Sequence, residues 1–465
     1  MKNQIFDCAR GMDPGLAQGE RVAPLPPRQS PHCLVTRQAA WNKFKLIVLL
    51  VPTAIFLIGC GVRGVRQHEG ERWAMGAEAS AVSPDPSNIV LMLPLKGKFA
   101  ADSKAIRNGF LAAYYHARKK NPDVNIKVLD TTGNDPRILY KEAIASGAGI
   151  VVGPLTKRAV EDLMKVDSLP VPVIALNTLD DYSSYFRANF YQFGLLPQDE
   201  ATQVADKMML DKHDQAAVIF PDNAWGEKIA DTFKDRYEQS GGQVAAFLSY
   251  NSKANISEQI CYFLAEDPNE LCVPKKKKDK KKEKKKEKEQ KKLAGEGQEP
   301  EEEDLEPEEP KRRQDINTIF LVANAKDARQ IVPMLKFYYA GDLPVYATSS
   351  IYSGVRAPNL DRDLDGMNFC DMPWVLQNPR FFSADLQSIH QQVTTLWHDS
   401  FSSHSKLYGL GVDAYILATG LNKFLRRAHD GLDGATGKLY LDNSNHIYRE
   451  LKWARMRRGV PVVHK

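Results

Sequence analysis

The residue whose type and position most clearly suggest a chemical modification is Cys60, whose thiol lies at the end of the segment 57–60 (LIGC). An apolar run of thirteen residues, 46–58, leads into it, and Lys43 and Lys45 stand just before that run. A helix needs about 20 apolar residues to cross a bilayer. The run is therefore too short to span a membrane, and its layout is that of a charged region and an apolar region of a signal peptide.

A small residue before the cleavage point is what a signal peptidase needs, because a bulky side chain would not fit its site. The pair Gly59 and Cys60 resembles the bacterial lipoprotein signal, which predicts cleavage between them and acyl chains on the thiol and new amino terminus of Cys60. Gly61 lacks the carboxylate that commonly keeps lipoproteins in the inner membrane, so we expect an outer-membrane anchor facing the periplasm. The alternative is a buried core helix with a chance cysteine.

Cys261 and Cys272 lie close in the sequence and could react with each other. Export to an oxidising compartment makes a disulfide between them feasible. It would close a short loop and contribute up to about 3 kcal/mol in the chain-entropy model. A free buried thiol at each position is an equally compatible interpretation. The chain has no CxxC pair and no Cys/His spacing typical of a metal site, so we expect no metal.

A catalytic constellation is not recognisable in the sequence. There is no GxSxG elbow, Walker loop or HExxH motif. His390 and His398 fall on an expected helix without a carboxylate three or four residues away, which favours core or surface histidines over ligands. Asp180 and Asp181 are adjacent rather than opposed, which gives no reason to propose glycosidase chemistry. We therefore expect neither catalytic residues nor a cofactor.

Composition divides the 465 residues into a foldable body and polar segments. Hydrophobic residues make up 43% of the chain, enough for a globular core. The formal net charge of +5 is small and comes largely from lysine-rich patches, so we expect no nucleic-acid partner. Residues 1–59 are interpreted as an N-terminal extension and signal peptide, and 60–87 as a flexible tether.

The tract 275–313 interrupts the body with a block rich in lysine and glutamate and then an acidic block. Neither block can bury enough apolar area to fold, so we expect a disordered insertion. The favoured interpretation is an inert solvated loop. The alternative is a basic arm that touches anionic lipid headgroups or cell-wall polymer.

The remaining sequence alternates strand and helix patterns in two successive series. In the first, strands are expected at 88–95, 124–130, 149–153 and 171–176, with helices at 101–119, 135–146 and 157–166. In the second, helices are expected at 197–210, 225–240, 256–265 and 327–339, and strands at 216–220, 243–250, 318–323 and 344–348. Helical patterns at 377–399 and 408–427 follow, and 437–441 with 448–455 is expected to form a closing hairpin. This order predicts an α/β fold with two parallel sheets covered by helices.

A ligand of an open α/β sheet binds beyond the carboxyl ends of its strands. The residues that follow the expected strands, and so line a candidate cleft, are Lys96, Thr156, Asn177, Asp222 and Trp225. Thr156 stands at a helix start, where exposed N–H groups could hold an anionic group. The alternative is that Thr156 only caps its helix and Trp225 only packs against the edge of a lobe.

Several short motifs resemble the C-terminal domain of the LpoA-type lipoproteins, which are outer-membrane activators of penicillin-binding proteins. They include Lys96-Gly97-Lys98-Phe99, Gly153-Pro154-Leu155-Thr156, Pro197-Gln198-Asp199-Glu200-Ala201, Asn223-Ala224-Trp225-Gly226, Asp365-Gly366 and Gly434-Ala435-Thr436-Gly437. The resemblance covers about 88–463 apart from the Lys/Glu tract. We expect no counterpart of the helical, tetratricopeptide-like N-terminal domain of longer members, and we expect the tether to stand in its place.

This resemblance implies a bilobal fold of the type I periplasmic binding proteins, with two Rossmann-like parallel-sheet lobes and a hinge. We expect lobe 1 at about 88–193 and 349–430, and lobe 2 at about 194–348 and 431–463. The implied function is non-enzymatic: activation of a class A penicillin-binding protein in peptidoglycan synthesis through protein contact, with peptidoglycan as a further contact. The alternative is a periplasmic solute receptor that binds an amino acid or peptide between its lobes.

Overall fold

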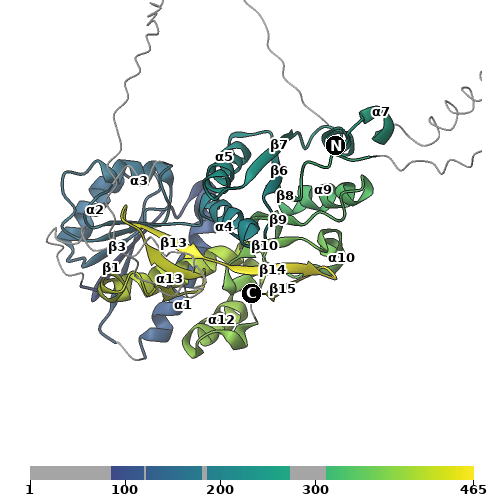
Figure 1. Ribbon diagram of the computed structural model, residues 1–465. Helices are drawn as coiled ribbons and strands as arrows, with labels where there is room; N and C mark the ends of the chain where they lie inside the picture. Colours follow the sequence, from purple (N-terminus) through teal and green to yellow (C-terminus); the bar gives the residue numbers. More distant parts are fainter. Residues whose placement is uncertain (1–84, 120–121, 181–185, 273–310, 377, 465) are drawn as a thin grey trace, which may run out of the picture. The chain divides into compact units, whose positions relative to one another are not determined.

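The computed structural model describes residues 85–119, 122–180, 186–272, 311–376 and 378–464 (Figure 1). The chain divides into two units, 1–67 and 68–465, and all the described residues belong to the second. The predicted signal peptide, the lipidation at Cys60, nearly all of the tether and most of the Lys/Glu-rich insertion lie outside the described residues. None of the helices in the described ranges has the length and apolar content that crossing a membrane requires.

The first sheet has eight strands in the order β11-β12-β13-β5-β4-β3-β1-β2. Its strands are β1 (Asn88–Leu93), β2 (Asn125–Asp130), β3 (Ile150–Val152), β4 (Val173–Ala175), β5 (Phe190–Phe193), β11 (Leu432–Asp433), β12 (Lys438–Leu441) and β13 (His446–Glu450). Strands β1 to β5 and β13 run parallel, whereas β12 is antiparallel to both β11 and β13. The apolar run in β1 is buried from Ile89 to Leu93, as expected of a central strand covered on both faces.

The second sheet has seven strands in the order β15-β14-β10-β9-β8-β6-β7. They are β6 (Gln215–Pro221), β7 (Gln243–Tyr250), β8 (Thr318–Leu321), β9 (Val345–Ala347), β10 (Asn368–Asp371), β14 (Lys452–Arg457) and β15 (Val460–His464). Strands β6 to β10 are parallel, and the C-terminal pair β14 and β15 extends them in antiparallel fashion. Both sheets are thus mixed rather than purely parallel.

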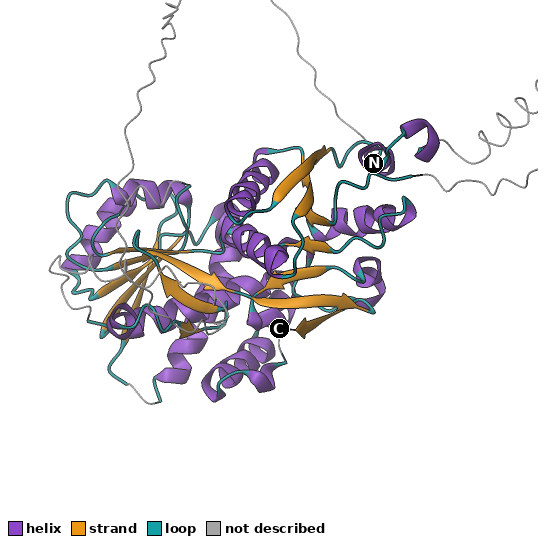
Figure 2. Ribbon diagram, viewed as in Figure 1, coloured by secondary structure: helices purple, strands orange, loops and turns teal. Residues whose placement is uncertain are grey.

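Helices pack against the sheets and connect their strands (Figure 2). The longer ones are α1 (Ala100–Ala117), α2 (Pro136–Ala145), α3 (Lys157–Met164), α4 (Pro197–Leu210), α5 (Ala224–Gln239), α6 (Ile256–Leu264), α9 (Ala325–Phe337), α12 (Ala384–Leu396) and α13 (His398–Arg426). Short ones are α7 (Pro268–Leu271), α10 (Pro358–Asp361), α11 (Pro373–Leu376) and the 3₁₀ turn η3 (Ser349–Ile351). These α/β layers agree with the predicted fold class.

The lobes to which some segments were assigned differ from the sheets in which their strands pair. β10 lies within the range 349–430 assigned to lobe 1, yet it pairs with β9 in the second sheet. Strands β11 to β13 lie within 431–463, assigned to lobe 2, yet β13 pairs with β5 in the first sheet. The expected hairpin partner 448–455 is divided at Leu451 between β13 and β14, which belong to different sheets. Local periodicity indicates a strand but not which edge it extends, so the pattern could not decide these assignments.

Helices α1 and α13 approach so closely that two positions require glycine. A Cβ atom at Gly109 would lie 2.1 Å from the carbonyl oxygen of Tyr408, and one at Gly411 would lie 2.0 Å from that of Ile106. Because these neighbours are backbone atoms in packed helices, neither can move without shifting a helix. The two glycines therefore set the distance between α1 and α13 beside the first sheet.

We predict that Gly411→Ala destabilises the protein by about 1–3 kcal/mol, the usual cost of overpacking a core. Urea unfolding followed by circular dichroism measures it. Gly420→Ala is the matched control on the same helix, because nothing lies within 4 Å of its added Cβ, and alanine is the better helix former by about 1 kcal/mol. Equal midpoints for both variants would contradict the close-approach explanation.

Candidate functional site

A cavity of about 510 Å³ lies between connections of the first sheet and helix α5, which follows β6 of the second. It is lined by residues from the first turn of α3, the loop after β4, the connection from β5 to α4, and the first turns of α5: Lys157, Asn177, Thr178, Asp180, Gly194, Leu195, Leu196, Pro197, Gln198, Ala224, Trp225 and Lys228. Its position at the carboxyl ends of parallel strands is where ligands of open α/β sheets bind.

An ion-pair cluster bridges this cavity. The carboxylate of Asp180 accepts hydrogen bonds from Lys157 on α3 and from Lys228 on α5, the latter at 2.7 Å between Lys228 Nζ and Asp180 Oδ1. These bonds hold the pKa of Asp180 below its usual value. All three side chains are 40–49% exposed, so the pairs contribute little to stability. An anionic ligand could replace Asp180 as the partner of the two lysines.

The amino termini of three helices also meet at the cavity. Lys157 is the first residue of α3, Pro197 of α4 and Ala224 of α5, and all three line it. A helix amino terminus carries a partial positive charge and exposed N–H donors. Thr178 adds a hydroxyl that is fully buried and has no hydrogen-bond partner in the described part of the chain. The cavity thus has the donors and the positive potential to hold a carboxylate.

The structure brings two of the five predicted cleft residues into this cavity. Trp225 lines it and is 41% exposed. Asn177 also lines it, but its amide is already engaged, because Nδ2 donates to the Leu155 carbonyl at 2.8 Å and Oδ1 accepts from the Thr178 N–H at 2.9 Å.

The other three predicted cleft residues do not line the cavity. Thr156 caps α3, with Oγ1 accepting from the Ala159 N–H at 3.3 Å, as the alternative interpretation held. Lys96 is largely exposed, with its Nζ 3.8 Å from the Asp130 carboxylate, and Asp222 lies 3.5 Å from the hydroxyl of Ser249. Sequence reasoning missed Lys157, Thr178, Asp180 and Lys228, since no local signal shows that they converge.

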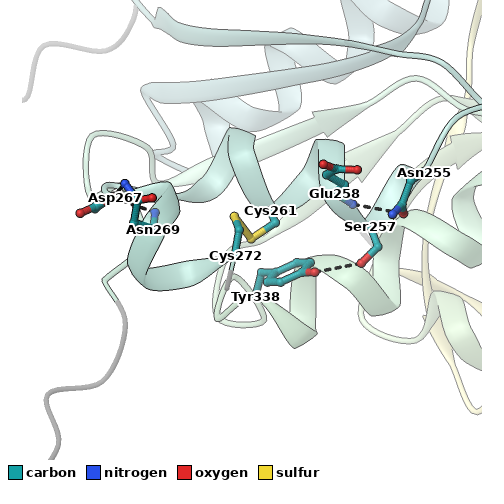
Figure 3. The surroundings of a disulfide bond; sticks show 8 residues. All are labelled: Asn255, Ser257, Glu258, Cys261, Asp267, Asn269, Cys272 and Tyr338. Carbon is teal, nitrogen blue, oxygen red and sulfur yellow. Dashed lines mark hydrogen bonds between the residues drawn. A yellow bond between two sulfur atoms is a disulfide. The ribbon is translucent and has the colours of Figure 1, made fainter. Parts of the chain in front are cut away.

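The cysteine pair forms a disulfide in the structure (Figure 3). Cys261 lies on α6 and Cys272 directly follows α7, with 5.7 Å between their Cα atoms. On the return side of the insertion, an antiparallel bridge pairs Ala265 with Arg312, and the Arg313 N–H donates to the Leu264 carbonyl at 2.8 Å. The disulfide and this bridge therefore hold Cys272 and Arg312 close to the end of α6.

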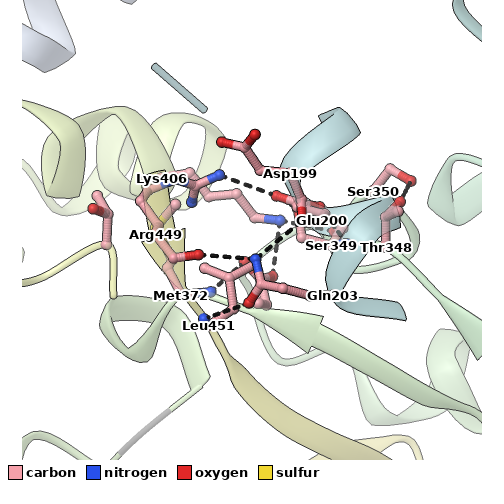
Figure 4. Close-up of polar contacts among 12 residues, drawn as sticks. Asp199, Glu200, Gln203, Thr348, Ser349, Ser350, Met372, Lys406, Arg449 and Leu451 are labelled. Carbon is pink, nitrogen blue, oxygen red and sulfur yellow. Dashed lines mark hydrogen bonds and ion pairs between the residues drawn. The ribbon is translucent and has the colours of Figure 1, made fainter. Parts of the chain in front are cut away.

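A buried polar network joins the two sheets (Figure 4). Glu200, 5% exposed in the first turn of α4, accepts from the Ser349 N–H at 2.9 Å and from the Ser349 hydroxyl at 3.1 Å. It also accepts from Arg449, 1% exposed on β13, at 3.3 Å. Ser349 begins η3, directly after β9 of the second sheet, whereas β13 belongs to the first. One carboxylate therefore connects both sheets.

Gln203 and Lys406 extend the network. Gln203 donates to the Arg449 carbonyl at 2.8 Å and accepts from the Leu451 N–H at 2.9 Å, which fixes the backbone where the chain passes from β13 to β14. Lys406 of α13 donates to the Ser349 carbonyl at 2.8 Å and lies 2.8 Å from the buried carboxylate of Asp371. Burial raises the pKa of Asp371 to about 6 even though Lys406 opposes the shift.

A loop motif of the first sheet is held by another buried carboxylate. Asp413 of α13 accepts from the N–H groups of Ala435 and Thr436 at 2.6 and 2.7 Å, and from the Thr436 hydroxyl at 2.6 Å. A Cβ at Gly434 would lie 2.6 Å from this carboxylate, so glycine is required there. The motif Gly434-Ala435-Thr436-Gly437 is thus explained by its docking on α13.

His446, at the start of β13, lies buried between two carboxylates. Its Nε2 is 3.3 Å from Asp199 Oδ2, and its Nδ1 is 3.6 Å from Asp442 Oδ2. Burial lowers the pKa of His446, but the attraction of the Asp199 and Asp442 carboxylates outweighs burial and raises it to about 9. The folded protein therefore holds the imidazolium proton more tightly than the unfolded chain, whose histidine pKa is near 6.5.

We predict that the free energy of unfolding falls as the pH rises from about 6.5 through about 9. The stabilisation from His446 is complete below the unfolded pKa and is lost above the folded one. At about 1.4 kcal/mol per pKa unit, the loss is roughly 3 kcal/mol. Denaturant titrations across this pH range measure it. His446→Gln should flatten the dependence, while His398→Gln, at an exposed site, should leave it intact. An equal slope in all three proteins would refute the assignment.

Comparison with known proteins gives consistent matches over the described body. The family model described as "LppC putative lipoprotein" matches residues 81–459. The penicillin-binding protein activator LpoA of Photobacterium profundum is 24% identical over 371 residues, which cover 79% of this chain and 55% of that protein. The chain thus spans about half the length of the curated relatives it matches.

Solved structures show the same fold. The C-domain of LpoA (YraM) from Haemophilus influenzae, described as a regulator of PBP1A, is similar with a TM-score of 0.60 and 21% identity, covering 81% of this chain and 100% of that one. A "putative branched-chain amino acid ABC transporter" from Chromobacterium violaceum has a TM-score of 0.56 and 22% identity, covering 79% of this chain and 99% of that one. The fold resembles the LpoA C-domain and the transporter-associated binding proteins.

Proposed function

The chain belongs to the LppC lipoprotein family, whose model matches residues 81–459. On this basis we propose that it stimulates a class A penicillin-binding protein. The observation that carries the proposal is this match together with the alignment to LpoA activators over 79% of the chain. The fold that contains the two sheets resembles that of the LpoA C-domain. The action we propose is protein contact, without catalysis by this chain.

The proposed place of action follows from the amino-terminal sequence. Cys60 is the proposed acceptor of acyl chains, and cleavage after Gly59 would make it the first residue of the mature protein. We propose an outer-membrane anchor on the periplasmic side, with a class A synthase and peptidoglycan as the partners. Cys60→Ala should move the protein from the membrane fraction to the soluble fraction, and retention in the membrane would contradict the lipid anchor.

The direct test measures glycan polymerisation and peptide cross-linking by the cognate class A synthase, with and without the full chain. We expect at least one of the two rates to rise several-fold at a saturating concentration of the chain. Cys60→Ala is the matched variant in solution, because it lacks the lipid but retains the folded body, and it should stimulate equally. Unchanged rates for both activities would overturn the proposed function.

A second candidate function is a receptor for a small carboxylate in the 510 Å³ cavity. It is favoured by the two lysines around Asp180, the three helix amino termini and the buried Thr178 hydroxyl. A ligand at 100 times its Kd stabilises the folded state by about 2.7 kcal/mol. A panel of amino acids, acidic peptides and muropeptides should then include one that raises Tm in the natural chain and not in Lys228→Ala. No shift with any ligand would exclude the receptor among these classes.

A further inference from the structure

A second cavity, of about 530 Å³, lies at the opposite edge of the second sheet. It is lined at the amino ends of β9 and β10 by Val345 and Asn368, whereas the first cavity lies at the carboxyl ends of strands. Its walls also include residues of α4, α9, β14 and β15: Lys207, Val332, Leu335, Lys336, Arg455 and His464. The activity proposed above assigns nothing to this cavity.

The carboxylates of this cavity are already engaged within the chain. Asp211 accepts from Lys207 at 2.7 Å and from the hydroxyl of Tyr346 at 2.6 Å. Asp342 pairs with Arg312 at 2.6 Å, and Asp365 accepts from the Gly459 N–H at 2.7 Å. A positively charged ligand would therefore have to displace existing partners.

The cavity is lined by three cationic side chains and three carboxylates, and two of the cations have no carboxylate partner among the described residues. Lys336 donates to the backbone carbonyl of Asp365 at 2.8 Å, and this contact leaves its charge without a carboxylate partner among the described residues. Arg455 lines the cavity, and Arg457 lies two residues along β14, on the same face of the strand. The side chains of Arg455, Arg457 and the neighbouring Arg458 have no hydrogen bond or ion pair with any of the residues the structure describes. Guanidinium groups of this kind suit carboxylate partners.

Apolar side chains accompany these charges. Val462 is directly opposite Arg455 in the β14–β15 pair and is 42% exposed. Within the cavity, Val332, Leu335 and Met367 are among the apolar lining residues. The volume is typical of a ligand pocket rather than of a site for one small anion. An occupant that matches these features carries carboxylates together with apolar side chains.

We propose that this cavity is a docking site for an acidic segment of a partner protein, with glutamate or aspartate side chains on Arg455 and Lys336 and an apolar side chain in the cavity. Charge complementarity argues for this occupant, because Lys336 and Arg455 have no carboxylate partner among the described residues, whereas Asp211 and Asp342 are each paired with a cation of the chain. This docking site depends on neither the lipid anchor nor synthase stimulation, so it is independent of the proposed function.

The test measures fluorescence anisotropy of a labelled octapeptide, six glutamates around a central leucine–phenylalanine pair, titrated with the full chain at 0.15 M salt. We expect saturable binding that Arg455→Glu and Lys336→Glu each weaken at least ten-fold. Arg426→Glu is the matched control, because Arg426 belongs to a separate cationic cluster with Lys423 and Arg427, and it should change the Kd less than two-fold. A peptide with serines in place of the leucine–phenylalanine pair should bind at least five-fold more weakly.

Several results would overturn the inference. One is the absence of saturable binding, and another is an equal loss for Arg426→Glu, which would indicate non-specific charge attraction. Full displacement of the peptide by millimolar inorganic phosphate, or equal binding of the serine peptide, would indicate a small-anion site. Sedimentation velocity that shows self-association abolished by Arg455→Glu would make a second copy of this chain the occupant. Arg455 is exposed, so the variant should keep its Tm, which the same samples verify.

Discussion

The contact on which the rest of the structure depends is the buried ion pair between Glu200 and Arg449. Arg449 lies on a strand of the first sheet, and Glu200 binds Ser349, which follows a strand of the second. Two charges removed from water are costly unless each finds its partner, and an unpaired one is strongly destabilising. The sheets are therefore held in an arrangement that keeps these two buried charges paired.

This constraint bears on what the protein can do. A hinge that opened widely would separate Glu200 from Ser349 or Arg449, and Lys406 from Asp371. Glu200, Arg449 and Asp371 are buried, and Ser349 and Lys406 are partly buried. These buried contacts favour a protein that presents fixed surfaces over one that opens and closes around a ligand. The ion pairs of Asp180 across the first cavity are exposed and weak by comparison, so they can exchange partners without disturbing the core.

Much of the fold could be predicted from the sequence, because apolar runs such as that of β1 and amphipathic helices such as α4 are local signals. β5 was not predicted, since it has only four residues and contains Gln192, whose burial depends on accepting the Leu179 N–H. The allocation of β10 and of β11 to β13 between sheets was wrong, because pairing across distant segments leaves no local trace.

The candidate site, like the fold, could be predicted only in part from the sequence. Asn177 and Trp225 were found because residues after parallel strands share one edge of a sheet. Lys157, Asp180 and Lys228 were not, because the contact of α5 with a loop of the other sheet follows from tertiary packing alone. Glu200 belongs to a motif that resembles a known family, but its role as the buried partner of Arg449 required the structure.

The most direct test of this account is a double-mutant cycle on Glu200 and Arg449, measured as the free energy of unfolding in urea. Glu200→Ala should cost about 3–5 kcal/mol, because it leaves Arg449 buried without its carboxylate. Glu200→Leu combined with Arg449→Met should recover most of that loss, since apolar replacement of a buried pair is often neutral. A cost for Glu200→Ala below about 0.5 kcal/mol, the range of ordinary surface substitutions, would contradict the claim that this pair holds the two sheets together.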